Sequence, residues 1–116
     1  MKVLFIDDRP SEIIALWQRS GLESTDTLLP VTPFVSLEKA LQQIKDFNPD
    51  MIVIGYGLGH PELTGADVVN FLRKNAVKAL LVGNSAGGLH QFEQSGVKLE
   101  KSIDRNPTNL KKLVQQ

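Results

Sequence analysis

Short, wholly apolar runs are the feature that most limits what this chain can fold into. Residues 3–6, 51–54 and 79–82 are VLFI, MIVI and ALLV, with no polar residue inside any of the three runs. Four-residue runs of this kind, rich in branched side chains, predict strands that are buried on both faces, as in a parallel sheet covered by helices. The sequence therefore predicts strands that alternate with helices around one parallel sheet.

Amphipathic stretches separate and follow these runs, and each has a helix start signal. Thr64 is followed three residues later by Asp67, the spacing at which a hydroxyl and an acid cap a helix reciprocally. Asn106 precedes a proline, which fits a cap followed by the first helical position. Helices are expected to begin at Pro10, Ser36, Thr64, Leu89 and Asn106.

Two further strands complete the alternation. Residues 23–35 contain Pro30 and Pro33, so a strand there must be short and lie at a sheet edge. Residues 98–101 predict a short fifth strand. With 116 residues, 41% of them apolar, the chain fits one domain with one core. We expect residues 1–116 to form a three-layer α/β/α sandwich with right-handed crossovers.

Composition excludes several classes of function. Thirteen basic and thirteen acidic residues give a formal charge of zero, so no sequence-wide field attracts nucleic acid or an anionic membrane. The chain has no cysteine, which excludes disulfides and thiolate chemistry and favours a reducing compartment. The apolar run near the N-terminus is far shorter than a signal peptide or membrane span requires. A cytoplasmic location is therefore expected.

Chemically useful side chains follow the predicted strands. In open parallel sheets, ligands bind outside the carboxyl ends of the strands. Asp7 and Asp8 follow the first strand, Ser85 follows the fourth, and Lys101 ends the fifth. Two carboxylates suit a hard cation, while a lysine and a hydroxyl suit phosphoryl oxygens. Together they predict a phosphate and divalent-cation site, except that the third strand delivers only Gly55.

Four segments together resemble the receiver domain of two-component response regulators. They are "FIDD", "NPDMIVIG", "GLGHPELTGADVVNFLRK" and "SGVKLEKS", and the resemblance covers essentially the whole chain. It implies a flavodoxin-like, doubly wound, five-stranded parallel sheet in the order 2-1-3-4-5. It also implies a role in bacterial-type two-component signal transduction.

The resemblance assigns roles to individual positions. It makes Asp7 and Asp8 the acid pair that helps bind Mg²⁺, and Lys101 the lysine that ends the fifth strand, followed here by Ser102. The aspartate that accepts the phosphoryl group falls on Gly55. The hydroxyl that ends the fourth strand falls on residue 83 or 84, glycine or asparagine, and residue 85 is a serine that can substitute for it.

The glycine at position 55 decides what the site can do. Phosphoryl transfer to a protein needs a nucleophile in line with the phosphorus, and glycine has no side chain. Loss of one carboxylate also weakens a Mg²⁺ site, so we expect no cofactor and at most weak metal binding by Asp7 and Asp8. Lys101 is expected to pair with one of these acids directly. The chain is therefore interpreted as a pseudo-receiver that is not an enzyme.

The leading hypothesis is a phosphorylation-independent signalling module that acts through protein–protein interaction. Its partner would be a sensor kinase, an effector domain or a second copy of the chain, and not nucleic acid or membrane. In the family, partners dock on the first helix or on the face of the fourth and fifth strands and helices. That second face predicts a homodimer through apolar residues that include Leu89, Phe92, Val97, Leu99, Leu110 and Leu113.

Two alternatives remain open at this point. The first is a small-ligand or anion sensor, in which the vacated acceptor pocket binds its ligand near Tyr56, Asn84, Ser85 and Lys101. The second is a metal-dependent enzyme built on Asp7, Asp8 and His60, with Glu62 nearby. The glycines of "GYGLG" lack the spacing of a dinucleotide-binding loop, and His60 and His90 are most simply surface histidines.

Overall fold

Strands and helices alternate along the chain, as the apolar runs predict. A computed structural model describes residues 2–21, 27–31, 37–59, 63–84, 90–99, 101–103 and 106–114. Its elements in order are β1 (Lys2–Ile6), α1 (Pro10–Arg19), β2 (Thr27–Val31), α2 (Leu37–Phe47), β3 (Met51–Ile54), α3 (Gly65–Lys74), β4 (Leu80–Gly83), α4 (His90–Gln94), β5 (Lys101–Ser102) and α5 (Pro107–Val114).

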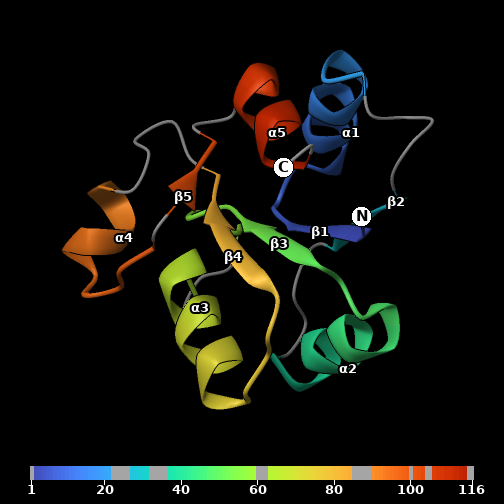
Figure 1. The fold of residues 1–116 in the computed structure, drawn as a ribbon. Coiled ribbons are helices and arrows are strands. Elements are labelled where there is room, and N and C mark those ends of the chain that lie inside the picture. The colour runs from blue at the N-terminus through green and yellow to red at the C-terminus, as the bar shows by residue number, and fades with distance from the viewer. Residues whose placement is uncertain are drawn as a thin grey trace.

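The strands form one sheet in the order β2-β1-β3-β4-β5, and all four neighbouring pairs are parallel. This confirms the predicted strand order. It also confirms that the proline-containing second strand lies at the sheet edge. Figure 1 shows α1 and α5 covering one face of the sheet and α2 and α3 the other, with α4 beside β5. The three-layer α/β/α arrangement is therefore confirmed.

Both faces of the central strands are buried, which explains why their sequences are apolar throughout. Along β1, Leu4 and Ile6 pack on the side of α2, α3 and α4, while Val3 and Phe5 pack on the side of α1 and α5. β3 alternates in the same way. Trp17 of α1 is buried against Phe5, with the two rings perpendicular and their centroids 6.5 Å apart.

Helix ends agree with their sequence signals where the structure describes them. The backbone N–H of Thr64 donates to Asp67 Oδ2 over 2.9 Å at the start of α3. Asn106 Oδ1 accepts from the backbone N–H of Thr108 over 2.8 Å at the start of α5, whose first residue is Pro107. Two of the expected helix-start residues, 36 and 89, lie outside the described residues.

The fifth strand is shorter and begins later than the sequence predicts. It spans Lys101–Ser102 rather than residues 98–101. The residues before Lys101 make hydrogen bonds outside the sheet. The N–H of Val97 donates to Phe92 O over 3.0 Å, which closes the end of α4. The carbonyl of Lys98 accepts Arg73 Nη2 over 2.7 Å. These bonds hold the chain against α3 and α4 before it can pair with β4.

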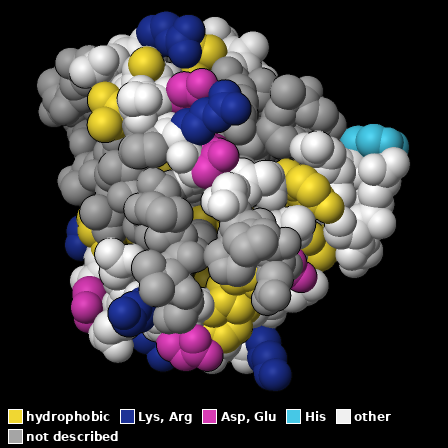
Figure 2. Space-filling view, turned by 180° about the vertical axis from the view of Figure 1, so that it is seen from behind, with side chains coloured by type: hydrophobic (Ala, Val, Ile, Leu, Met, Phe, Trp, Pro, Cys, Tyr) yellow, Lys and Arg dark blue, Asp and Glu magenta, His cyan; other side chains and the backbone are white. Residues whose placement is uncertain are grey.

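The surface mixes charges of both signs. Figure 2 shows basic and acidic side chains interspersed over one face of the molecule, which suits a protein whose formal charge is zero. Among the described residues, no helix has the length and apolar character needed to cross a membrane.

Candidate functional site

The carboxyl ends of β1, β3 and β4 bring three predicted site residues to one level. Ile6 pairs with Ile54, and Ile54 with Gly83, so the next residues along these strands are Asp7, Gly55 and Asn84. The N–H of Gly55 donates to Ile6 O, and the N–H of Asn84 to Ile54 O, each over 2.8 Å. The ladder of bonds therefore continues one residue past each strand.

This register decides which residue ends β4 at the site. Asn84 lies level with Gly55, whereas a side chain at Gly83 would face Phe92 and Leu99 in the core. Of the two positions that the sequence leaves open for the missing hydroxyl, the structure therefore selects Asn84. Asp7 and Asn84 are both buried, with exposures of 1% and 0%.

The carboxylate of Asp7 lies over Gly55. A Cβ atom built on Gly55 would be 2.7 Å from Asp7 Oδ2 and 3.3 Å from its Cγ, and the first distance is shorter than real Cβ contacts allow. The backbone of Gly55 is itself buried. The carboxylate of Asp7 would therefore have to move if position 55 carried a side chain.

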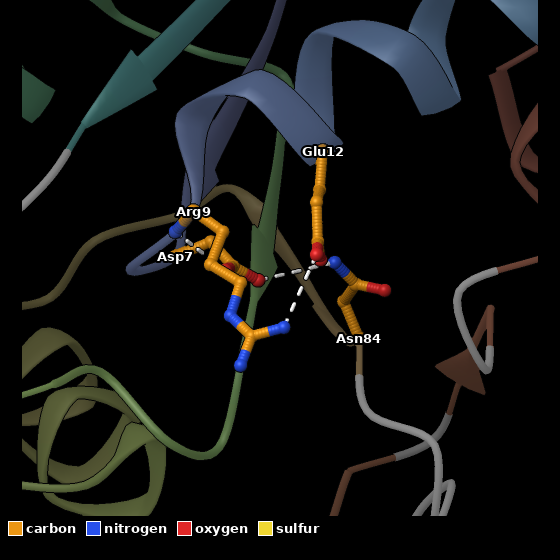
Figure 3. Close-up of polar contacts among 4 residues, drawn as sticks. All are labelled: Asp7, Arg9, Glu12 and Asn84. Carbon is orange, nitrogen blue, oxygen red and sulfur yellow. Dashed lines mark hydrogen bonds and ion pairs between the residues drawn. The ribbon is translucent and has the colours of Figure 1, made fainter.

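Two donors hold Asp7 in this position (Figure 3). Its Oδ1 accepts the backbone N–H of Arg9 over 3.1 Å. Its Oδ2 lies 3.5 Å from Asn84 Nδ2, at the outer limit of a hydrogen bond. A carboxylate can only accept hydrogen bonds, so the amide nitrogen of Asn84 must face it and the amide oxygen must face away.

Arg9 is a site residue that the sequence analysis missed. Its Nη1 lies 3.1 Å from Glu12 Oε1, one turn along α1. The hydrogen bond and charge of Glu12, followed by the charges of Asp8 and Asp7, raise the pKa of the Arg9 guanidinium above its ordinary value. The signal was present in the sequence, because an arginine directly follows the acid pair and stands three residues before a glutamate.

Of the remaining predicted site residues, some are described by the structure and others are not. Asp8 is half-buried against Gly59 and does not cap α1, because the cap position is Arg9. Lys101 and Ser102 form β5 and are half-buried, and the pairing of Lys101 with Asp7 or Asp8 stays a prediction. Residues 60, 62 and 85, the predicted histidine, glutamate and serine, lie outside the described residues.

Tyr56, the residue after Gly55, faces α4. Its hydroxyl lies 2.6 Å from Ser95 Oγ, and its ring meets Phe92 edge-on with centroids 5.4 Å apart. The tyrosine therefore links the end of β3 to α4.

Asp50 lies at the amino end of the strands, at the opposite edge of the sheet from Asp7. Its Oδ2 accepts the backbone N–H of Lys2 over 2.8 Å at the amino end of β1. It contributes nothing to the carboxyl edge, where Asp7 and Asn84 meet.

A receiver-type Mg²⁺ site does not fit the residues present. Position 55 offers no carboxylate, and the oxygens of Asp7 already face the Arg9 N–H and Asn84. Within the part of the chain that the structure describes, no three His, Cys, Asp or Glu side chains gather closely enough to hold a metal. The charge of Arg9 also stands close to both acids. We therefore assign no step at this site to a metal.

The contact between Asp7 and Gly55 can be tested by a double-mutant cycle of the free energy of unfolding. We expect Gly55→Ala to lower the free energy of unfolding by about 1 to 2 kcal/mol, because the new methyl group must displace a buried carboxylate. The loss should shrink by more than about 0.5 kcal/mol in an Asp7→Ala background, where the space is free. Urea denaturation of the four chains tests this. Equal losses in both backgrounds would contradict the placement of Asp7.

Comparison with known proteins bears on the fold. No protein-family model matches the sequence, and no curated protein matches it. A response regulator of Thermotoga maritima in complex with Mg²⁺ and BeF has a TM-score of 0.73 and 21% identity, covering 98% of this chain and 96% of that one. A chemotaxis response regulator of Vibrio cholerae has a TM-score of 0.73 and 18% identity, covering 98% and 95%.

A third solved structure gives the same result. The receiver domain of a Francisella response regulator has a TM-score of 0.70 and 22% identity, covering 98% of this chain and 93% of that one. At these identities the likeness is one of fold. The chain therefore has the flavodoxin-like fold of receiver domains, as the sequence predicts.

Proposed function

We propose that this chain is a pseudo-receiver, a regulatory module that signals through protein–protein interaction without being phosphorylated. The observation that carries the proposal is Gly55, whose missing side chain is replaced in space by the carboxylate of Asp7. The fold supports a place among signalling modules. On this proposal the chain is not an enzyme, needs no cofactor and works in the cytoplasm.

The contacts at the site favour a single arrangement of its residues that does not depend on phosphorylation. A phosphorylated receiver changes when a dianionic phosphoryl group and a metal enter the carboxyl edge of the sheet. Here Asp7 is already bound by the Arg9 N–H and lies beside Asn84, and Arg9 is paired with Glu12. Part of the negative charge at this edge is therefore already engaged by Arg9, and Asp7 is held without a phosphoryl group.

The first helix is the surface that best fits a protein partner. Ile14 of α1 is the large apolar side chain that the described residues leave exposed, at 42%. The face predicted for a homodimer is unsuitable, because Phe92, Val97, Leu99 and Leu110 are buried in the core. Leu113 is half-buried, and residue 89 is not described. A sensor kinase, effector domain or second copy would therefore meet the chain on α1, around Ile14.

Incubation with acetyl phosphate and Mg²⁺ tests the central claim. We expect the intact mass to stay unchanged, because position 55 has no nucleophile. A receiver domain with an intact acceptor aspartate, treated in parallel, shows that the phosphodonor is active. If the chain gains the mass of a phosphoryl group and Asp8→Asn abolishes the gain, phosphorylation independence is wrong.

A further inference from the structure

A hollow lies on the α1 side of the sheet, beside Asn84. Its volume is about 260 Å³. The described residues that line it are Glu12, Ile13, Ala15, Leu16, Arg19 and Asn84. Successive turns of α1 form one wall, and Asn84, which follows β4, contributes an amide side chain. This volume is close to the lower end of small-molecule pockets.

Asn84 brings an unsatisfied acceptor to this hollow. Its side chain is completely buried, and among the residues that the structure describes its Oδ1 has no hydrogen-bond partner. Figure 3 shows this oxygen pointing away from Asp7 and Arg9. Rotating the amide by half a turn gives no relief, because it would bring Oδ1 against the carboxylate of Asp7. Buried acceptors are nearly always paired, so one without a partner needs an explanation.

We propose that the hollow binds a small, uncharged heterocycle through a ring N–H that donates to Asn84 Oδ1. The donor would satisfy a buried acceptor that the described part of the chain leaves unpaired. Ile13 and Leu16, both buried in the core, give the hollow an apolar wall against which a planar ring can pack. A molecule of one or two rings, the size of a nucleobase, suits the volume.

The charges around the hollow favour a neutral ligand. Glu12 and Arg19 lie two turns apart on α1 with opposite signs, so together they bring no net charge to the hollow. Glu12 is also already paired with Arg9. Behind Asn84 lies the carboxylate of Asp7, which would repel an anion placed at Oδ1. This differs from the anion sensor that the sequence left open, because an anion needs donors where this hollow presents an acceptor.

The proposal is independent of the pseudo-receiver function. It rests on Asn84 and α1, and it would hold even if the chain were phosphorylated. Asn84 nevertheless joins the two sites, since its Nδ2 faces Asp7 while its Oδ1 serves the hollow. A bound ring would fix the amide and strengthen the contact that holds Asp7 over Gly55.

Matched pairs of ring compounds test the proposal by amide NMR of the full chain. The probes are uracil, 2-pyridone, benzimidazole and indole, each compared with the derivative in which every ring N–H is methylated. We expect at least one N–H compound to cause saturable shifts at Asn84 and along α1. Its N-methylated partner should bind about tenfold more weakly, because Oδ1 then stays unpaired.

Two substitutions on α1, one inside the hollow and one outside it, test whether the probes bind there. Ala15→Leu places a larger side chain in the hollow and should abolish the shifts, whereas Gln18→Leu adds a similar side chain to the same helix outside it. If Ala15→Leu does not fold, Ala15→Met serves the same purpose. The proposal is overturned if none of the four N–H probes gives saturable shifts. It is equally overturned if N-methylation or Ala15→Leu leaves the binding unchanged.

Discussion

Gly65→Ala is expected to lower the free energy of unfolding by more than about 3 kcal/mol, and the melting temperature by about 10 °C or more. A Cβ atom at this position would lie against the carbonyl group of Gly55 and within 3.0 Å of Tyr56 Cα. Both are backbone atoms, so neither can turn aside as a side chain could. The N–H of Gly65 also donates to Tyr56 O over 2.6 Å, which fixes the start of α3 against the site.

Gly57→Ala is the matched control for this substitution. Gly57 lies in the loop that precedes α3, and a Cβ atom there meets nothing within 4 Å. Its melting temperature should stay within a few degrees of the parent, since exposed substitutions usually change stability by about 0.5 kcal/mol or less. A thermal melt of both variants measures the difference. A Gly65→Ala chain as stable as Gly57→Ala would show that α3 does not approach Gly55 so closely.

Phe92→Ala is expected to destabilise the chain by about 3 to 5 kcal/mol, the usual cost of deleting a buried aromatic ring. Phe92 has an exposure of 0% and comes from α4, a helix of 5 residues. Its ring packs edge-on against Tyr56, and it occupies the space beside Gly83. Because so short a helix has little stability of its own, its attachment depends on this ring.

A substitution at Gln91, the residue before Phe92, shows whether a change in α4 alone lowers stability or whether the loss comes from the missing ring. Gln91 is exposed on α4, so Gln91→Ala should leave the urea midpoint nearly unchanged. The Phe92→Ala chain should also lose protection from amide exchange at Ser95 and Val97, whose N–H groups both donate to Phe92 O. If stability falls while these amides stay protected, α4 is held by other contacts.

The parts of the fold that sequence could predict are those set by local pattern. Residues 3–6 form a strand without polar residues, so both faces of that strand must be buried. Burying both faces requires helices on each side of the sheet. The Thr64 and Asp67 pair marks the start of α3 for a similarly local reason. The strand order came from the receiver resemblance rather than from any local pattern.

The parts that sequence could not predict depend on contacts between distant segments. Whether Gly83 or Asn84 ends β4 at the site is a difference of one residue in register, which only pairing with β3 decides. The Asp7 carboxylate lies over Gly55 because the glycine has no side chain there. The residues next to Asp7 in the sequence do not predict this contact. The late start of β5 likewise depends on the bond from Arg73 to Lys98 O.

The carboxylate over Gly55 also bears on whether one substitution could give this site an acceptor aspartate. Gly55→Asp alone must displace Asp7, whose carboxylate occupies the space that the new side chain needs. The first substitution therefore costs stability unless a second change moves Asp7. The stability penalty of Gly55→Ala measures that cost. The effect of a substitution at position 55 is in this sense epistatic with residue 7.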